Sequence, residues 1–436
     1  MKKNHLFGMF AMAAFAFASC SQDEVVTQSP QVNKAIEFGT YVGRDAVSRA
    51  HVIGVDKLAE EGFGVFAYYT GQNTIAEALA TATPNFMYNQ KVHSTEGSEG
   101  ATNNGVVSWN GTWKYDPLKY WPNNVDDKVS FYAYAPYDIG QNGNFVLPSS
   151  DSKGKPSLVF KVGTDVEKHQ DLLYASPAED KSKNSSSPVN VGDKINFDFQ
   201  HALARIGFKA EVMVDYVNGD GTGNADDDKT TSNGALDQYT TITINSVKLI
   251  GKFYTQGVMK LEDGTWPTNS LETPTEDVTF ELNSTSTSDF ATRTTPNNIF
   301  KTNDIEIRQL NNDENYIMII PQNFTETGAN APGNLKMIVE YEVFTDLDRD
   351  GVEDANDSKI TNKITSDNFA LNFEQGKAYS LNIHIGMTSV KFSATVQNWD
   401  PVNGTDYVVN VPINTETPAP TPTSGGGDTG GGTLEN

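Results

Sequence analysis

The chain has 436 residues, of which 56 are Asp or Glu and 32 are Lys or Arg, so its formal net charge is −24. Such an acidic chain repels phosphate backbones and anionic headgroups, which argues against nucleic-acid binding and against peripheral membrane binding. Charged residues make up 20% of the sequence and aromatic residues 10%, and Thr, Asn, Ser and Gly are abundant. This usage is typical of folded, β-rich extracellular protein rather than of disorder.

Residues 1–19 are predicted to form a lipoprotein signal peptide. Two lysines are followed by an apolar stretch that is too short to span a bilayer and that ends in small residues before Cys20. The sequence FASC is similar to the lipobox of bacterial lipoproteins, whose cysteine is acylated and becomes the first residue of the mature chain. Cys20, the only cysteine, is therefore expected to carry lipid such as palmitate, which excludes disulfides and cysteine catalysis.

Residues 20–34 are expected to form a lipidated N-terminal leader. Its first residues after the cysteine, SQDE, look like the acidic signal that sends some lipoproteins to the outer face of the outer membrane. The sequence therefore predicts a surface-exposed protein of the cell outer membrane.

Period-two alternation of apolar with polar or small residues is the main signal in residues 35–216, the predicted N-terminal domain. It predicts half-buried strands at IEFGTYV (36–42), FGVFAYY (63–69), VSFYAYA (129–135) and KINFDFQ (194–200). The stretch TIAEALATA (74–82) is expected to form a short helix. Residues 217–234 are polar and rich in Gly and Asp, which predicts a linker.

Residues 235–413 form the predicted C-terminal domain. Its strand candidates are YTTITINSVKLIG, GKFYTQGVMKL, DVTFELN, ENYIMIIPQ, LKMIVEYEVF, AYSLNIHIG and VKFSATVQNW. Each half holds roughly seven candidate strands at the spacing of a β-sandwich. Residues 414–436 are rich in Pro, Thr and Gly and are expected to form a flexible tail.

The order of several motifs resembles that of fimbrillin-like proteins. The motifs are FGVFAYY, WKYDPLKYWP, VSFYAYAP, DLLYA, FDFQHALARIGF, ITINSVKLIGKFYTQG, YIMIIPQ and FEQGKAYSLNIHIGMTSVKFSATVQNW. The resemblance, which extends from about residue 36 to residue 411, implies an all-β fold of two transthyretin-like Greek-key β-sandwich domains in tandem. It also implies a type V pilus subunit, an Mfa-like fimbrillin lipoprotein that assembles with other subunits into surface fimbriae and has a role in adhesion.

The resemblance further implies how assembly proceeds. In that family an arginine-specific protease removes the first strand, and the vacated groove accepts a strand from another subunit. The matching arginine here is Arg49, with Arg44 as second choice, since both follow the strand at 36–42. The alternative, that Arg49 is an ordinary solvated loop residue, stays open. The segment DYVVNVPI (406–413) is a candidate donor strand, or equally the chain's own last strand.

The stretch DLDRDGVEDAND (346–357) has the spacing of a calcium loop and also resembles a thrombospondin type 3 calcium repeat. Ca²⁺ takes about six to eight oxygen ligands, and such a loop supplies carboxylates, one backbone carbonyl and a turn glycine. The candidate ligands are Asp346, Asp348, Asp350, the carbonyl of Val352, Asp354 and Asp357. We expect structural Ca²⁺ because five unneutralised carboxylates would repel one another. The alternative is an acidic, solvated hairpin loop.

No catalytic residue is predicted. The histidines of the mature chain are dispersed without metal-ligand spacing, and His201 is expected to be a structural residue at a strand end. An aromatic cluster could stack on sugar rings or pack in the core; its members are Trp109, Trp113, Tyr115, Tyr120 and Trp121.

Two function classes remain open. The first is a structural or accessory fimbrial subunit joined by β-strand complementation. The alternative is a monomeric surface-anchored lipoprotein that binds glycans or host proteins. A secreted hydrolase would need an acid/base pair that the sequence does not identify.

Overall fold

The computed structural model describes most of the chain between Ala35 and Trp399 and the backbone of Val409–Ile413. The described residues are 35–43, 53–94, 96–97, 99–103, 106–137, 144–183, 194–212, 236, 238–272, 274–283, 298–301, 307–311, 316–328, 331–366, 368–385, 390–399 and 409–413. Strands dominate these residues, which confirms the predicted all-β class. None of the described helices has the length and apolar character needed to cross a membrane.

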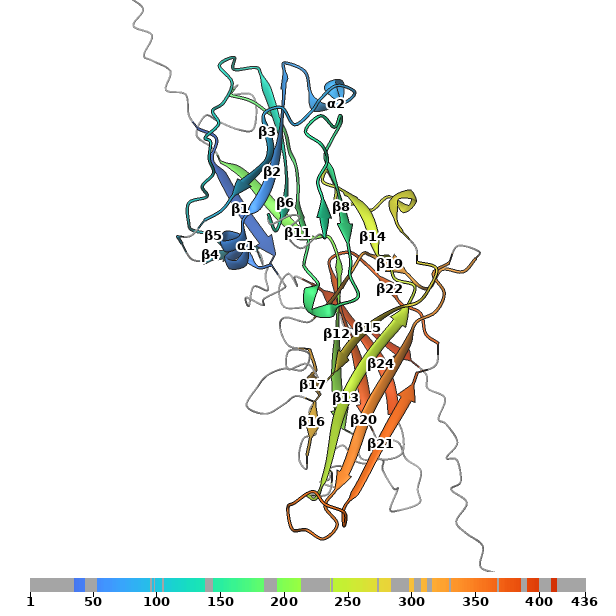
Figure 1. The fold of residues 1–436 in the computed structure, drawn as a ribbon. Coiled ribbons are helices and arrows are strands. Elements are labelled where there is room, and N and C mark those ends of the chain that lie inside the picture. Colours follow the sequence, from blue (N-terminus) through green and yellow to red (C-terminus); the bar gives the residue numbers. More distant parts are fainter. Residues whose placement is uncertain are drawn as a thin grey trace, which may run out of the picture.

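The first half of the chain forms one nine-stranded sheet in the order β3-β2-β6-β9-β11-β1-β5-β4, with β10 paired to β6. The strands are β1 (Phe38–Gly43), β2 (Phe63–Gly71), β3 (Met87–Val92), β4 (Glu99–Asn103), β5 (Val106–Trp109), β6 (Lys128–Ala135), β9 (Leu173–Ala175), β10 (Ala178–Lys181) and β11 (Ile195–His201). Helix α1 (Val55–Glu61) lies against this sheet and buries Leu58 and Ala59 in its core (Figure 1).

This sheet curls over its own core. Phe38 in β1 and Phe63 in β2 lie four strands apart in the sheet order, yet their ring centroids are only 6.3 Å apart. A flat sheet would separate them by about 19 Å, because neighbouring strands are about 4.8 Å apart. The parts of the sheet that hold β1 and β2 therefore face each other, an arrangement compatible with the predicted sandwich.

The expected alternation holds for β1 and β11 but not for β2 and β6. In β11 buried and exposed residues alternate along the whole strand. In β2 and β6 both faces are buried, because Phe131 points into the first core while Phe66, Tyr132 and Tyr134 pack on the opposite side against β7 (Phe145–Val146) and β8 (Ser157–Lys161). The prediction that FGVFAYY and VSFYAYA form half-buried strands is therefore wrong about burial, because other strands pack on their second face.

Helix α2 (Ile75–Ala78) lies within the stretch predicted to be helical. Its N-cap is Thr74, whose hydroxyl accepts from the amide of Glu77 while the Glu77 carboxylate accepts from the amide of Thr74. This reciprocal capping satisfies two backbone donors at the start of the helix. Helix α1 was not predicted from the sequence.

The second half consists of two sheets that share one core. The first sheet has the order β17-β12-β23-β24-β25, with β18 paired to β12, and the second has the order β15-β13-β20-β21, with β16 paired to β13. The strands are β12 (Ala204–Val212), β13 (Thr240–Gly251), β15 (Val278–Asn283), β16 (Ile299–Phe300), β17 (Arg308–Gln309), β18 (Ile317–Ile319), β20 (Lys336–Thr345), β21 (Ser358–Thr365), β23 (Lys377–Ile385), β24 (Val390–Asn398) and β25 (Val409–Ile413). A separate pair joins β19 (Gln322–Asn323) to β22 (Asn372–Phe373).

The chain passes from the first half to the second earlier than the predicted linker. Strand β12, which lies inside the predicted domain 35–216, pairs in parallel with β23 along its whole length, from Arg205 opposite Ala378 to Val212 opposite Ile385. The change of sheet therefore occurs at Ala202 and Leu203. The predicted linker at 217–234 lies outside the described residues.

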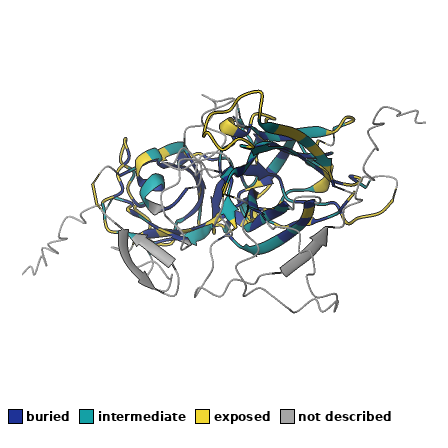
Figure 2. Ribbon diagram, turned by 90° about the horizontal axis from the view of Figure 1, so that it is seen from below, coloured by how far each residue is buried: buried dark blue, intermediate teal, exposed yellow. Residues whose placement is uncertain are grey.

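The two halves are joined by a shared sheet and a shared core. Strand β14 (Gln256–Lys260) of the second half pairs antiparallel with β8 of the first half, next to β7, and β8 and β14 lie side by side between the lobes in Figure 1. Short 3-10 helices occur at Val166–Lys168 and Thr268–Ser270. A third core combines Tyr132 and Phe160 with Met259 and Met318. Figure 2 shows buried residues continuing from one lobe into the other.

Candidate functional site

Strand β1 occupies an interior position in the first sheet. It runs parallel to β11, from Phe38 opposite Ile195 to Val42 opposite Phe199, and antiparallel to β5 on its other edge. The inward side chains of β1 and of Ile36, which precedes it, are almost completely buried; those in the strand are Phe38, Thr40 and Val42. The strand implied by the family resemblance to be removable is therefore, in the intact chain, a core strand.

The start of β1 is held by the loop that carries Tyr115. The amide of Ile36 donates to the carbonyl of Lys119 at 2.9 Å, and the buried hydroxyl of Tyr115 donates to the carbonyl of Ile36 at 2.8 Å. Burial raises the pKa of the Tyr115 hydroxyl, so it remains a donor at physiological pH. Sequence reasoning gave Tyr115 no such role, because only the aromatic cluster and not the backbone partner is visible in the sequence.

The chain after β1 returns to the described residues at Ile53. The amide of Ile53 donates to Asp171 Oδ2 at 3.0 Å, and His201 Nδ1 lies 2.9 Å from the same oxygen. The ring of His201 stacks on Trp399, with centroids 4.1 Å apart. His201 is the last residue of β11 and is buried, in keeping with a structural role. Asp171 was missed, although an acidic residue heading the apolar run DLLYA was a signal that could have been used.

The predicted modification sites are not among these residues. Cys20, Arg44 and Arg49 all lie outside the described residues. The structure describes the residues on either side of the predicted cleavage segment. Strand β1 ends at Gly43, and the next described residue is Ile53.

The candidate donor segment is paired within the chain. Strand β25 runs antiparallel to β24, from Phe392 opposite Ile413 to Val396 opposite Val409, and it ends the sheet order on that side. Within the described part of the chain, residues 409–413 of this segment therefore form an intramolecular last strand whose paired neighbour is β24.

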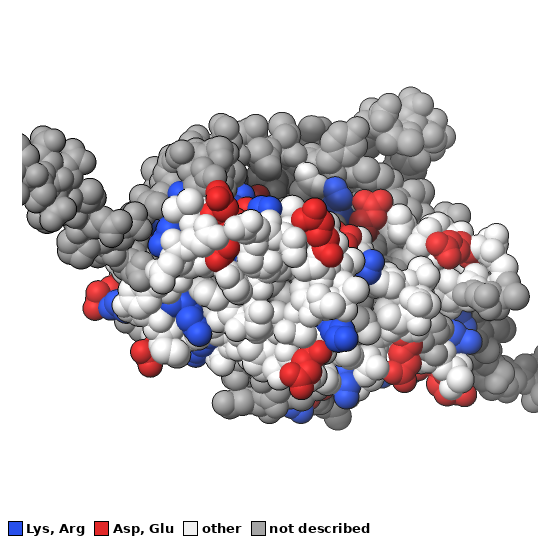
Figure 3. All heavy atoms as spheres, turned by 90° about the horizontal axis from the view of Figure 1, so that it is seen from above, with Lys and Arg blue, Asp and Glu red and all other residues white. Residues whose placement is uncertain are grey.

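The aromatic cluster is not assembled on the surface. Trp113, Tyr115 and Trp121 are buried in the first core, where Trp113 packs edge-on against Phe63 with ring centroids 5.0 Å apart. Tyr120 is 48% exposed and does not belong to the buried group. Core packing is therefore the better explanation of the cluster. Figure 3 shows acidic and basic side chains scattered over the end of the first lobe, with no dense patch of either sign among the residues drawn in colour.

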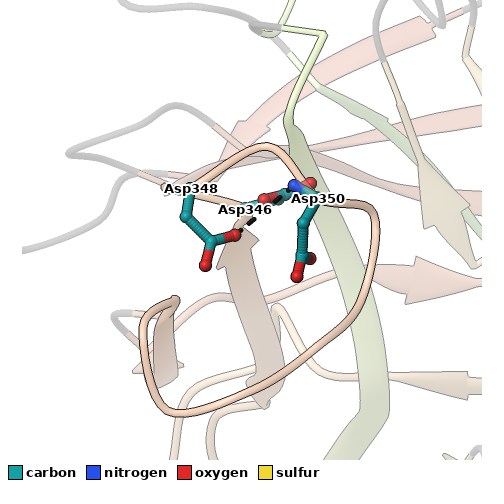
Figure 4. Close-up of side chains that lie close together, drawn as sticks. All are labelled: Asp346, Asp348 and Asp350. Atoms are coloured by element: carbon teal, nitrogen blue, oxygen red, sulfur yellow. Dashed lines mark hydrogen bonds between the residues drawn. The ribbon is translucent and has the colours of Figure 1, made fainter.

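The acidic loop between β20 and β21 brings three of its five aspartates together. Oxygens of Asp346, Asp348 and Asp350 all lie within 4.8 Å of one another (Figure 4). Gly351 has φ of 80°, the left-handed turn that a glycine was expected to supply. Carboxylates from alternate loop positions suit a hard cation such as Ca²⁺, so this group of residues fits the predicted ion.

All five aspartates accept hydrogen bonds from backbone amides of the loop; Asp346, for example, accepts from the amides of Arg349 and Gly351 at 2.6 and 3.0 Å. The two remaining carboxylate ligands, Asp354 and Asp357, are not part of the converging group. Asp357 accepts from the amides of Leu347 and Asp354 at 3.0 and 2.9 Å, and Asp354 accepts from the amide of Asn356 at 2.7 Å. Val352 is exposed. Asp357 therefore stabilises the loop through hydrogen bonds to its backbone. The carboxylates that converge are those of Asp346, Asp348 and Asp350.

Comparison with known proteins agrees with this architecture. The model of a family described as fimbrillin-like matches residues 49–399. The chain belongs to the fimbrillin-like family. The family is one of fimbrial structural proteins, so the chain is not an enzyme. The resemblance read from the order of the motifs is thereby confirmed.

Individual relatives of this fimbrillin-like chain match over most of its length. Fimbrium subunit Fim1C of Phocaeicola vulgatus is 26% identical over 421 residues, covering 92% of this chain and 98% of the relative. The structure of a fimbrial protein from Bacteroides vulgatus matches in fold, with a TM-score of 0.57, 21% identity and coverage of 84% of this chain and 100% of that chain. A fimbrial assembly protein from Parabacteroides distasonis has 11% identity and a TM-score of 0.39 over 87% of this chain and 100% of its own.

Proposed function

We propose that this fimbrillin-like chain is a structural or accessory subunit of cell-surface fimbriae that assembles by β-strand complementation. It is exported as an outer-membrane lipoprotein anchored through acylated Cys20, its partners are other fimbrial subunits, and the assembled fibre has a role in adhesion. The family and the relative named as a fimbrium subunit support the fimbrial role.

The interior position of β1 carries the assembly step of the proposal. Its departure would open the edges of β11 and β5 at once and would expose the core positions now filled by Ile36, Phe38, Thr40 and Val42. An unpaired sheet edge is a template for another strand, because the incoming backbone supplies hydrogen bonds and its alternate side chains fill the pockets. A chain that loses β1 therefore becomes an acceptor.

Cleavage after Arg49 would separate β1 from the rest of the chain. Residues 44–49 would leave with β1, and the new first residue would be Ala50, three positions before Ile53. Because the amide of Ile53 is held by buried Asp171, the chain downstream of the cut has its own anchor. Cleavage after Arg44 is the second choice and would leave five more residues on the new terminus.

We also propose that the loop 346–357 binds structural Ca²⁺ through Asp346, Asp348 and Asp350. Their oxygens converge within 4.8 Å, and the exposed loop leaves room for carbonyl and water ligands. Binding at this end of the second lobe would hold the hairpin of β20 and β21.

The experiment treats the chain without its acylated cysteine, residues 21–436, with an arginine-specific protease, followed by N-terminal sequencing and native sizing. We expect one cut, a new terminus at Ala50 and a ladder of oligomers. Arg49→Ala should remain monomeric, whereas Arg44→Ala should cut and assemble like the wild type. Cutting without assembly, or no cutting at all, would favour the alternative of a monomeric surface lipoprotein that binds glycans or host proteins.

A further inference from the structure

We propose that Ser393 is a nucleophilic serine that takes one acyl group from an activated carboxylic ester. Its hydroxyl is hydrogen-bonded to His384, and His384 is hydrogen-bonded to Glu211. A carboxylate, an imidazole and a hydroxyl in this order form the constellation that activates serine in hydrolases of unrelated folds. The three residues lie in the second half of the chain, in a different sheet from β1, so the site does not depend on the proposed strand exchange.

Three adjacent strands bring these side chains together. Glu211 on β12 is directly opposite His384 on β23, and Asn382 on β23 is directly opposite Ser393 on β24. Side chains two positions apart in a strand point to the same face, so Asn382 and His384 share one face of the sheet with both partners. Ile383, which lies between them, points to the other face and is buried in the core. Core strands therefore hold the group in place, as a preorganised site requires.

The contacts between these groups permit a proton to leave the serine. His384 Nδ1 lies 2.5 Å from Glu211 Oε1, and His384 Nε2 lies 3.0 Å from Ser393 Oγ. Ionised Glu211 can only accept, so neutral His384 carries its proton on Nδ1 and directs the lone pair of Nε2 at the serine hydroxyl. The side-chain amide of Asn382 donates to Ser393 Oγ at 3.3 Å, which leaves the proton of Ser393 for His384.

A small molecule can reach the group from solvent. The side chains of Glu211 and His384 are each 23% exposed, and Ser393 is also partly exposed. Two lysines lie on the same face, because Lys391 is directly opposite His384 and Lys209 is two positions before Glu211 on β12. Their positive charges favour the oxyanion that forms when a serine attacks an ester carbonyl.

The reaction forms one ester bond and breaks another. Ser393 Oγ attacks the carbonyl carbon of the ester while its proton passes to His384 Nε2, and Glu211 stabilises the imidazolium that results. When the tetrahedral intermediate collapses, the bond from the carbonyl carbon to the leaving oxygen breaks, and the imidazolium gives its proton to that oxygen. Ser393 keeps the acyl group, and the alcohol of the ester is released.

The hydrogen bonds at the serine predict acylation without turnover. In the described part of the chain, the side-chain amide at Ser393 is that of Asn382. One amide stabilises an oxyanion less than a preorganised set of several donors does. We therefore expect slow reaction and one acyl group per chain, which agrees with a structural protein rather than an enzyme.

The first test labels the uncut chain, residues 21–436, with a fluorophosphonate probe and locates the modified residue by mass spectrometry. We expect the label on Ser393 and no label in Ser393→Ala. The matched control is Ser380→Ala, which removes a partly exposed hydroxyl on the same face of β23, opposite Thr395. This control should label like the wild type. Labelling that is no stronger at Ser393 than at Ser380 would overturn the inference.

Variants of the two partners separate activation from a structural contact. His384→Ala should lower the labelling rate by at least about a hundredfold, and added imidazole should restore part of the rate. Glu211→Gln should lower the rate by at least about tenfold, whereas Glu211→Asp keeps the charge and should lose less. Melting temperatures show that each variant is folded. A labelling rate at Ser393 that is unchanged in His384→Ala would show that the three residues only join their strands.

The substrate p-nitrophenyl acetate tests the acyl class. We expect release of p-nitrophenolate equimolar with the chain, and one acetyl group on Ser393. A chain that takes the phosphonate but releases no p-nitrophenolate would contradict the acyl class. Release that continues well beyond one equivalent would contradict a single stable acylation.

Discussion

The carboxylate of Asp171 accepts a hydrogen bond at 3.0 Å from the backbone amide of Ile53, a residue 118 positions earlier in the chain. Asp171 is completely buried and also pairs with His201, whose ring stacks on Trp399. The guanidinium of Arg205 lies 5.1 Å from the Trp399 ring on the second-half side. One buried carboxylate thus ties the segment after β1 to the junction of the two halves.

Replacing Asp171 should therefore be strongly destabilising. Asp171→Ala would leave the Ile53 amide and buried His201 without their shared acceptor, and breaking a buried pair from one side costs about 3–5 kcal/mol of unfolding free energy. Denaturant unfolding measures the loss. The control Asp263→Ala removes an exposed aspartate that bonds within its own turn, and its cost should stay below about 1 kcal/mol. Equal effects of the two variants would contradict the anchoring role.

The contact between the halves can be tested at Gly264. This residue has φ of 70° and lies directly under the ring of Tyr174, so a Cβ atom at this place would overlap the ring. Gly264→Ala should cost about 2–4 kcal/mol, since steric overlap adds to the strain of a left-handed residue. Gly333→Ala, at φ of 84° with no neighbouring atom near its Cβ position, carries the strain alone and should cost about 1–2 kcal/mol. Thermal unfolding of both variants should show this difference, and equal losses would mean that the contact of the halves adds nothing.

Calcium should stabilise the second lobe. If the dissociation constant were about 0.1 mM, about 1 mM Ca²⁺ would add roughly 1.4 kcal/mol to the unfolding free energy. We expect a rise in melting temperature that a chelator reverses and that is absent in the double variant Asp348→Ala with Asp350→Ala. The control is Glu276→Ala with Asp277→Ala in another exposed loop, which should keep the response. A melting temperature of the wild type that does not change with Ca²⁺ would contradict the proposed calcium site.

The ion pair between Glu340 and Lys363 predicts a small pH dependence of stability. These residues lie directly opposite each other on β20 and β21 with 2.9 Å between their charged groups, and the hydrogen bond from Lys363 lowers the pKa of Glu340 below its usual value of 4.5. Charged Glu340 therefore stabilises the fold above about pH 4.5, and this contribution is lost as the pH falls through the lowered pKa.

Glu340→Gln should lower the unfolding free energy at pH 7 by about 0.5 kcal/mol, the usual size of an exposed ion pair. The difference from the wild type should vanish by about pH 3. Urea unfolding at the two pH values measures it, with Glu276→Gln as an exposed control. A difference that persists or grows at low pH would show that Glu340 acts through something other than its charge.

The sequence predicted the strands better than the packing between them. Alternation identified β1 and β11 correctly because each has one buried face. It also located β2 and β6, but it missed the burial of their second face, since the packing of Phe66 and Tyr132 depends on β8, which joins the sheet of β14 from the other half of the chain. The change of sheet at Ala202 was likewise hidden, because no Gly or Pro cluster marks it and β12 continues directly from β11.

For the candidate sites too, contacts between residues close in sequence could be predicted, whereas contacts between distant residues could not. The acidic loop could be read from spacing because all its ligands are local in sequence, and three of them do converge. By contrast, two hydrogen bonds join residues that are far apart in the sequence. Tyr115 bonds to Ile36, 79 positions away, and Asp171 bonds to Ile53, 118 positions away. Such contacts depend on the folded topology, and no short motif reports them.

The central claim is that the chain enters fimbriae after losing β1. The most direct measurement is mass spectrometry of the first residue of this chain in fimbriae sheared from cells that produce it. The account predicts that the fibre-borne chain begins at Ala50, and that Arg49→Ala leaves the chain on the cell with its terminus at acylated Cys20. A chain that is present in fibres and still contains residues 36–43 would contradict it.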